Sequence, residues 1–207
     1  MNLKTNKKFI YLLSPSSIKN NKFFVDLVEV LSTNKISFFQ LRLKGESYKK
    51  SLSIAKKAKR ICKKFNVKFI INDNPSFAKK IGADGCHLGQ KDICLQQARK
   101  ILKRRIIGVT CHNSIKLVKK ATKDGADYVA LGSFFKSKTK KNAIRSKIQI
   151  INKAKKVSKL PIVCIGGITD KNYKKLILHK PNFLAISNYI WSNSKLKPKE
   201  AVKKIDL

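Results

Sequence analysis

The chain has 207 residues, of which 43% are hydrophobic, so it is long enough for one large domain with a substantial core, and its composition argues against general disorder. Its 48 Lys and Arg residues against 11 Asp and Glu residues give a formal net charge of +37. No apolar run reaches the ~18 residues that a membrane-spanning helix needs, and the run Phe9–Leu13 is too short for a signal peptide.

Short apolar runs alternate with amphipathic segments from one end of the chain to the other. Several of the runs are β-branched or aromatic and nearly continuous, which is typical of strands buried on both faces. The predicted strands are Phe9–Leu13, Ser37–Leu41, Lys68–Asn72, Gly85–Leu88, Ile106–Val109, Tyr128–Gly132, Ile162–Ile165 and Phe183–Ser187.

Amphipathic helices fill the gaps between these strands. In the segment between the second and third strands, one helical face carries Ile54, Ala58, Ile61, Cys62 and Phe65. Eight similar strand–helix units predict an α/β fold, either a closed (β/α)8 TIM barrel or an open doubly wound sheet. The near-equal units and the absence of G-x-G-x-x-G after the first strand favour the barrel, as a single domain over residues 1–207.

The positive charge has two interpretations. A nucleic-acid-binding protein is one. A compositional drift toward lysine is the other, and it is favoured because the lysines are spread through every predicted helix. Arginine, which specific base recognition uses most, is scarce in this chain. We therefore expect no specific nucleic-acid partner and only weak, salt-sensitive binding to polyanions.

The five cysteines form no C-x-x-C pair. Cys62, Cys86 and Cys164 lie in apolar stretches, so we expect buried thiols in a reduced cytoplasmic protein. The dipeptides Cys86-His87 and Cys111-His112 do not form a zinc site by their spacing, because neighbouring strand residues point to opposite faces.

Catalytic residues of a (β/α)8 barrel lie where strands end and the following loops begin. The second strand ends in Gln40-Leu41-Arg42-Leu43-Lys44, where alternation puts Gln40, Arg42 and Lys44 on one face. Two buried cations would need an anion, which a diphosphate or a carboxylate from a neighbouring strand could supply.

Two carboxylates follow the next two strands. Asp73 comes after Asn72, and Asp92 follows His87-Leu88-Gly89-Gln90. Two carboxylates facing a diphosphate suit Mg²⁺. The structural alternatives are an Asx-type turn at Asn72-Asp73 and an N-cap at Asp92 for a helix that begins at Ile93.

The remaining strand ends are also polar or rich in glycine. His112, after the fifth strand, suits either a general acid–base or a helix N-terminus, and the loop Ser137-Lys138-Thr139-Lys140 suits either phosphate binding or a solvated loop. Gly166-Gly167 and Ser187-Asn188 follow the last two strands, where (β/α)8 barrels frequently bind phosphate.

Taken in order, these segments resemble the thiamine-phosphate synthase family along nearly the whole chain. The motifs that carry the resemblance are Gln40-x-Arg42-x-Lys44, Asn72-Asp73, Gly82-Ala83-Asp84-Gly85-x-His87-Leu88-Gly89-Gln90-x-Asp92, Gly108-Val109-x-x-His112, Gly125-Ala126-Asp127-Tyr128-Val129, Thr139-Lys140 and Ile165-Gly166-Gly167-Ile168. The chain departs from the family at Thr110, where Ser is more frequent, at Ser137 and at Asn188.

The resemblance implies a transferase that joins a pyrimidine diphosphate to a thiazole phosphate with Mg²⁺ as cofactor. It implies metal ligands at Asp73 and Asp92, and catalytic cations at Arg42, Lys44 and Lys140. The residues implied to hold the pyrimidine diphosphate are Gln40, Leu41, Arg42, Leu43, Lys44, Asn72, Thr110 and Lys140. Those implied to hold the thiazole phosphate are Ser137, Lys138, Thr139, Gly167, Ile186 and Ser187.

The implied reaction is dissociative: diphosphate leaves, and the thiazole nitrogen traps the resulting pyrimidine methylene cation. Two rival functions stay open, a thiazole tautomerase-like isomerase on the same fold and a basic nucleic-acid-binding protein. The oligomeric state is also open, with a homo-oligomer included.

Overall fold

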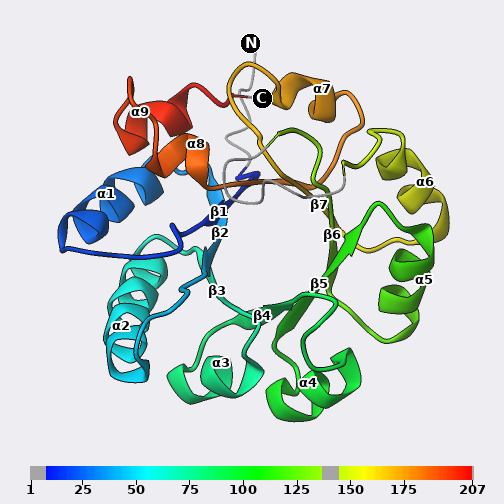
Figure 1. The fold of residues 1–207 in the computed structure, drawn as a ribbon, viewed down its shortest axis with the longest axis horizontal. Helices are drawn as coiled ribbons and strands as arrows, with labels where there is room; N and C mark the ends of the chain where they lie inside the picture. The colour runs from blue at the N-terminus through cyan, green and yellow to red at the C-terminus, as the bar shows by residue number, and fades with distance from the viewer. Residues whose placement is uncertain (1–7, 137–144, 207) are drawn as a thin grey trace.

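The fold is a closed barrel of eight parallel strands in the order β1-β2-β3-β4-β5-β6-β7-β8 (Figure 1). The computed structural model describes residues 8–136 and 145–206. The strands are β1 Ile10–Leu13, β2 Ile36–Leu41, β3 Lys68–Asn72, β4 Gly85–Leu88, β5 Ile106–His112, β6 Tyr128–Leu131, β7 Ile162–Ile165 and β8 Phe183–Ile186. This confirms the predicted (β/α)8 barrel and rules out the open sheet, because β1 pairs with both β2 and β8.

Helices surround the barrel on its outside (Figure 1). They are α1 Lys22–Leu31, α2 Tyr48–Lys64, α3 Pro75–Ile81, α4 Leu95–Leu102, α5 Ile115–Lys123, α6 Ile150–Val157, α7 Tyr173–Ile177, α8 Asn188–Trp191 and α9 Pro198–Lys203. The predicted inner face of α2 is confirmed at Ile54, Ala58 and Cys62, which are buried, whereas Ile61 and Phe65 are only partly buried.

The predicted strand limits hold to within one residue except in β5. That strand continues through Thr110 and Cys111 to His112 and contains a register irregularity between Thr110 and His112 opposite β6. The apolar pattern misses this extension because Thr110 and His112 are polar, although both are strand residues.

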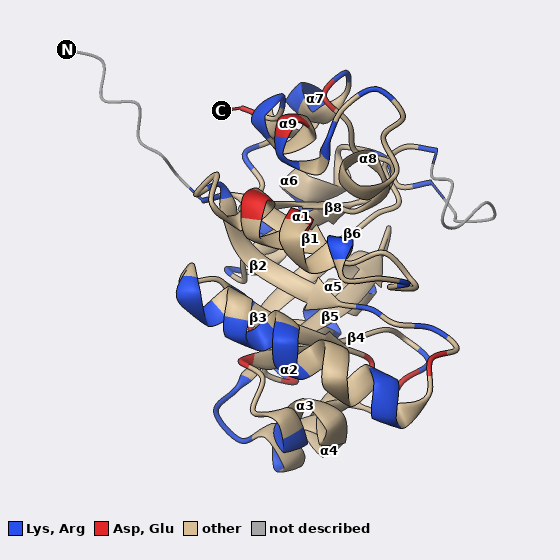
Figure 2. Ribbon diagram, turned by 90° about the vertical axis from the view of Figure 1, so that its left-hand side faces the viewer, with Lys and Arg blue, Asp and Glu red and all other residues tan. Residues whose placement is uncertain are grey.

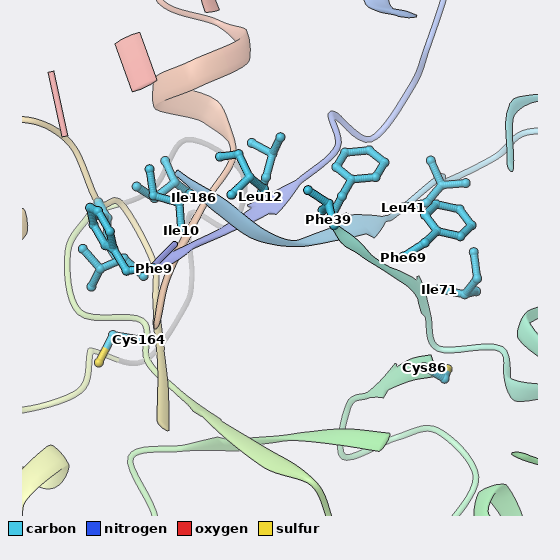
Figure 3. Packing of buried hydrophobic residues seen from close by; sticks show 14 of the residues in the cluster. Phe9, Ile10, Leu12, Phe39, Leu41, Phe69, Ile71, Cys86, Cys164 and Ile186 are labelled. Atoms are coloured by element: carbon cyan, nitrogen blue, oxygen red, sulfur yellow. The ribbon is translucent and has the colours of Figure 1, made fainter. Parts of the chain in front are cut away.

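Alternating strand side chains build two separate apolar layers. The outer layer lies between strands and helices and includes Leu12, Phe39, Phe69, Cys86 and Ile186 (Figure 3). The inner layer fills the barrel and consists of Tyr11, Leu13, Ile70, Tyr128, Ala130, Val163 and Ala185, with Phe38, Ile106, Ile165 and Phe183 packed against them. The barrel is therefore a filled core rather than a pore, and a ligand has to bind at one of its ends.

The thiols follow the same layering. Cys62, Cys86, Cys111 and Cys164 are buried in the outer layer, and Cys94 is exposed. Burial raises the pKa of the Cys86 and Cys111 thiols to about 12, so both remain neutral. Burial of Cys62, Cys86 and Cys164 confirms the expectation from their apolar surroundings.

Lysine and arginine occur along several of the helices, including α2, α3 and α9 (Figure 2). Several form ion pairs with the scarce carboxylates, such as Lys22 with Asp26 at 2.6 Å and Arg99 with Asp127 at 2.7 Å. Within the described residues, no helix combines the length and the apolar composition that crossing a membrane would require.

Candidate active site at the carboxyl end of the barrel

The end of β2 brings an amide and a cation to the barrel mouth. Gln40 is 3% exposed, and its Nε2 donates a hydrogen bond to Tyr11 Oη inside the barrel at 3.1 Å. Leu41, the next residue, packs into the outer layer. Arg42 is partly buried, and its backbone N–H donates to Ser14 Oγ at 2.9 Å. The predicted alternation is therefore confirmed at Gln40 and Leu41.

Lys44 differs from the expectation of a buried cation. It is exposed and lies in the loop after β2, which ends at Leu41. The loop is fixed to the end of β1 by a hydrogen bond from the Lys44 backbone N–H to Ser16 O at 2.9 Å. Glu46 also accepts a hydrogen bond from Ser17 Oγ at 2.9 Å, so two hydrogen bonds hold this segment against the loop after β1.

Asp73 directly follows β3 in a left-handed backbone conformation with φ 64°. Asp and Asn adopt this conformation more readily than most residues. The Asp73 backbone N–H donates to His87 O at 2.8 Å, which fixes the loop against β4. The helix cap that follows is Asn74, whose Oδ1 accepts from the Phe77 N–H at 2.9 Å, so Asp73 has no capping task.

Asp92 lies in the loop between β4 and α4. Its Oδ2 accepts a hydrogen bond from the Gly89 N–H at 2.6 Å. The alternative that Asp92 caps the next helix is wrong, because α4 begins at Leu95 and the residue at its N-cap is Cys94. The carboxylate is thus held toward the loop at the end of β4.

The carboxyl groups of Asp73 and Asp92 lie close enough to share a proton. The pKa of Asp73 is raised to about 6, first by its reduced hydration and then by the hydrogen bond and negative charge of Asp92, while Arg42 and Asn72 act in the opposite direction. Two facing carboxylates beside a single guanidinium form a site that gains from a further cation.

This donor set fits Mg²⁺, which prefers oxygen ligands and commonly takes one or two carboxylates together with phosphate oxygens and water. Among residues 8–136 and 145–206, no three His, Cys, Asp or Glu side chains gather in a way that could hold a metal by themselves.

Thr110 faces the same mouth from within β5. Its Oγ1 is 2.8 Å from His87 Nε2, and its carbonyl oxygen accepts from the Gln90 side chain. His112 ends the strand, is exposed, and has φ 50°. Cys86 and His87 point to opposite faces of β4: Cys86 lies in the outer layer and His87 in the barrel. Opposite faces are what the sequence analysis expected when it argued that this dipeptide does not bind zinc.

The loops after β7 and β8 close the other side of the mouth. Gly167 has φ +62°, and a Cβ atom there would lie 2.3 Å from Lys136 O. The glycine therefore allows the loop after β6 to approach closely. Ile186 is buried, and Ser187 Oγ donates to Ser14 O at 3.1 Å, which joins the end of β8 to the end of β1.

The structure thus brings together, at the carboxyl ends of the strands, most of the residues named from the sequence. They are Gln40, Arg42, Asn72, Asp73, Asp92, Thr110, Gly167, Ile186 and Ser187. Ser137, Lys138, Thr139 and Lys140 lie outside the described residues.

The sequence analysis missed the polar groups inside the barrel. Hydrogen bonds run from Tyr11 to Tyr128 and from Tyr128 to His87. They connect Gln40, which bonds Tyr11, with Thr110, which bonds His87. A usable signal was present: Tyr11 and His87 occupy inward positions of their strands, and a polar side chain at an inward position requires a partner.

Comparison with known proteins identifies close relatives of this chain. A family model described as thiamine monophosphate synthase matches residues 10–190. The chain is 60% identical to the thiamine-phosphate synthase of Pelagibacter ubique, over 98% of each chain. It is 38% identical to the thiamine-phosphate synthase of Erythrobacter litoralis, over 88% of each.

Solved structures support the fold. The thiamine phosphate pyrophosphorylase of Pyrococcus furiosus superposes with a TM-score of 0.85 and 23% identity, covering 98% of this chain and 95% of that one. The 3-hexulose-6-phosphate synthase of Salmonella typhimurium superposes with a TM-score of 0.69 and 16% identity, covering 95% and 96%. Proteins with different activities share this barrel, so the fold alone does not name a reaction.

Proposed function

The chain belongs to the thiamine monophosphate synthase family, and from that premise we propose which of its residues carry out each part of the reaction. Its function is thiamine-phosphate synthesis, and the enzyme is a transferase. The substrates are a pyrimidine that bears a methylene diphosphate and a thiazole that bears a phosphate. The thiazole tautomerase-like alternative gains no support from the relatives, which are named as synthases.

The reaction breaks the bond between the pyrimidine methylene carbon and the diphosphate oxygen, and that oxygen keeps the bonding electron pair. The thiazole nitrogen then donates its lone pair to the methylene cation and forms the new C–N bond. The products are thiamine phosphate and inorganic diphosphate. No proton has to be transferred in these steps, so the site needs charge stabilisation more than acid–base groups.

The diphosphate half of the site is formed by the loops after β2 and β3. Arg42 and Lys44, with Asn72 and Lys140, hold the diphosphate and neutralise the charge that develops on the leaving oxygen. Gln40 and Thr110 complete the pyrimidine site with their side chains. Leu41 and Leu43 pack against the outer layer, so they would contribute backbone groups to it. Arg42 is well suited to this task because it is partly buried and its planar guanidinium can make two parallel hydrogen bonds.

Asp73 and Asp92 are the residues that would hold Mg²⁺. The metal ion, when bound, supplies positive charge that stabilises the diphosphate as it leaves. The position of that charge is set by the two residues, since the backbone N–H of Asp73 donates to His87 O and the carboxylate of Asp92 accepts from the Gly89 N–H.

The thiazole phosphate half lies across the mouth. Ser137, Lys138, Thr139, Gly167, Ile186 and Ser187 hold this substrate. The described part of this half supports the assignment. β8 ends at Ile186, Ser187 Oγ donates to Ser14 O directly after β1, and the Ser14 hydroxyl accepts from the Arg42 backbone N–H. Both substrates are then held against the same strand ends.

We also propose that residues 1–207 form one domain that works in the cytoplasm on these small molecules, without a membrane or specific nucleic-acid partner. A homo-oligomer is compatible with the site, since every group named above comes from one chain.

The single observation that carries the proposal is the meeting of Asp73, Asp92 and Arg42 at one barrel mouth. The test is to incubate the protein with both phosphorylated substrates, with and without Mg²⁺, and to measure thiamine phosphate. Product that forms only with Mg²⁺ supports the proposal. Failure to form product, together with isomerisation of the thiazole alone, would replace it by the tautomerase-like function.

A further inference from the structure

A continuous chain of hydrogen bonds crosses the interior of the barrel from Gln40 to Thr110. Gln40 Nε2 donates to Tyr11 Oη at 3.1 Å, and Tyr11 Oη is 2.7 Å from Tyr128 Oη. Tyr128 Oη is 2.9 Å from His87 Nδ1, and His87 Nε2 is 2.8 Å from Thr110 Oγ1. The chain thus joins two residues at the mouth through three residues below them.

The strands are arranged to make this chain. His87 on β4 is level with Gly108 on β5, which is level with Tyr128 on β6. A Cβ atom on Gly108 would lie 1.9 Å from Tyr128 Cζ, so only glycine leaves room for the Tyr128 ring to cross β5 and reach His87. The rings of His87 and Tyr128 are stacked, with centroids 5.6 Å apart.

The Gln40 amide is oriented with Nε2 toward Tyr11 Oη, and this orientation together with the single proton of each hydroxyl sets the direction of the chain. Burial raises the pKa of Tyr11 and of Tyr128 far above the ordinary range, so each phenol keeps its one proton. Tyr11 already accepts from Gln40 and must donate to Tyr128. Tyr128 then donates to His87 Nδ1, which leaves the proton of the neutral imidazole on Nε2, pointing at Thr110 Oγ1.

This direction has consequences at both ends. Gln40 uses its amide N–H inside the barrel, so its Oε1 is the atom left to serve as an acceptor. Thr110 accepts from His87, so its own hydroxyl proton is left to serve as a donor. The opposite direction would reverse both roles, because Tyr11 would then donate to the oxygen of a flipped Gln40 amide.

We infer that Tyr11, Tyr128 and His87 are positioning residues that present Gln40 as a hydrogen-bond acceptor and Thr110 as a hydrogen-bond donor to the aminopyrimidine substrate. An aminopyrimidine offers amino N–H donors and ring-nitrogen acceptors, which this pair of groups complements. The inference rests on the proposed function, which places Gln40 and Thr110 in the pyrimidine site.

The kinetic test uses hydroxyl deletions that keep the ring. Tyr128→Phe still fills the space beside Gly108, so the barrel should fold, but the chain is cut between Tyr11 and His87. Loss of one oriented hydrogen bond predicts a decrease of about tenfold in kcat/KM for the pyrimidine diphosphate, with KM for the thiazole phosphate changed by less than about twofold. Tyr11→Phe should have the same selective effect, because it removes the acceptor of the Gln40 amide.

The matched control is Tyr173→Phe. Tyr173 is also buried and its hydroxyl donates to Asp206 O at 2.7 Å, but it lies in the outer layer on α7. This variant should leave both kinetic parameters unchanged. A loss in Tyr128→Phe no larger than that in Tyr173→Phe would overturn the inference.

The double variant Tyr128→Phe with Thr110→Val distinguishes an effect of Tyr128 through Thr110 from a general effect on the stability of the barrel. If Tyr128 acts through Thr110, then Tyr128→Phe should lower kcat/KM by less than about twofold further in the Thr110→Val background. An equal tenfold loss in both backgrounds would mean that Tyr128 acts independently of Thr110, which overturns the Thr110 half of the inference.

A measurement without substrate tests the direction of the hydrogen-bond chain separately from the reaction. In protein labelled with ¹⁵N-histidine at about pH 8, above the ordinary histidine pKa of about 6.5, the His87 resonances should show the proton on Nε2. Comparison with His87→Gln identifies those resonances. A proton on Nδ1 would reverse the chain and overturn the inference, whereas a wild-type protein that makes no thiamine phosphate would overturn the proposed function instead.

Discussion

The carboxyl groups of Asp73 and Asp92 interact from the loops after two neighbouring strands, β3 and β4, and the positive charge of Arg42 acts on Asp73 as well. Their repulsion is part of what keeps the pKa of Asp73 raised to about 6. Without a cation, the repulsion between the two carboxylates destabilises the site, and a bound cation would offset that repulsion.

Asp73→Asn should stabilise the metal-free protein at neutral pH. The pKa of Asp73 is raised in the folded protein from 3.8 to about 6, so the folded state loses stability as pH rises from about 4 through about 6. Asn tolerates the left-handed backbone at this position, and its side chain does not ionise as pH rises. Thermal melts in EDTA should show a higher Tm for the variant at pH 7.5 and no difference near pH 4.

Added Mg²⁺ should reverse that order at pH 7.5, because it raises the Tm of the wild type more than that of Asp73→Asn. The effect on the wild type should weaken as pH falls through about 6, since protons compete for the carboxylate. A wild-type Tm that does not respond to Mg²⁺ at pH 7.5 would argue against a metal site here.

His112→Ala should reduce activity much less than removal of a metal ligand. His112 is exposed at the end of β5, and the proposed reaction requires no proton transfer. We expect kcat/KM within about tenfold of the wild type, a loss that general acid–base catalysis would exceed. A loss of 100-fold or more in the coupling assay would require a proton-transfer role for His112.

Gly167→Ala should displace the loop after β6. The new Cβ would meet Lys136 O at 2.3 Å and adds to the strain of φ +62°. Gly125→Ala is the matched control, because Gly125 has φ +85° but a Cβ there meets nothing within 4 Å. Both variants should lose roughly 1 kcal/mol to backbone strain. Only Gly167→Ala should also raise KM for the thiazole phosphate, and equal KM values in the two variants would contradict this account of the loop.

The positive surface should bind nucleic acid weakly and without sequence preference. Fluorescence anisotropy with unrelated DNA duplexes should give similar affinities that are largely lost at ~200 mM salt. Sequence-selective binding that survives such salt would show that the charge of +37 has a specific partner.

The strands were predictable because each is a short apolar run between amphipathic segments, and the strand-end rule then located Arg42, Asp73 and Asp92. The extent of β5 was not predictable in the same way, since Thr110 and His112 continue the strand by backbone pairing with β6 rather than by apolar side chains. The exposure of Lys44 depends on where the chain leaves the strand, which alternation alone does not define.

The inward positions of Tyr11 and His87 were visible in the sequence, but the partners that complete the polar chain were not. Tyr11, His87 and Tyr128 come from three strands, and their contact depends on the missing side chain of Gly108. Local sequence patterns carry strand and helix periodicity, whereas this contact exists only after the barrel has closed.

The most direct test of the central claim is a Mg²⁺ titration of the coupling reaction with wild type, Asp92→Asn and the control Asp26→Asn, whose carboxylate pairs with Lys22 on α1 away from the mouth. Thiamine phosphate and diphosphate should appear in equal amounts in the wild type and the control, with the same Mg²⁺ dependence. Asp92→Asn should fold normally, since an Asn oxygen can still accept from Gly89, but should lose about 100-fold or more in kcat/KM and require more Mg²⁺. A fully active Asp92→Asn variant with an unchanged Mg²⁺ dependence would contradict the account.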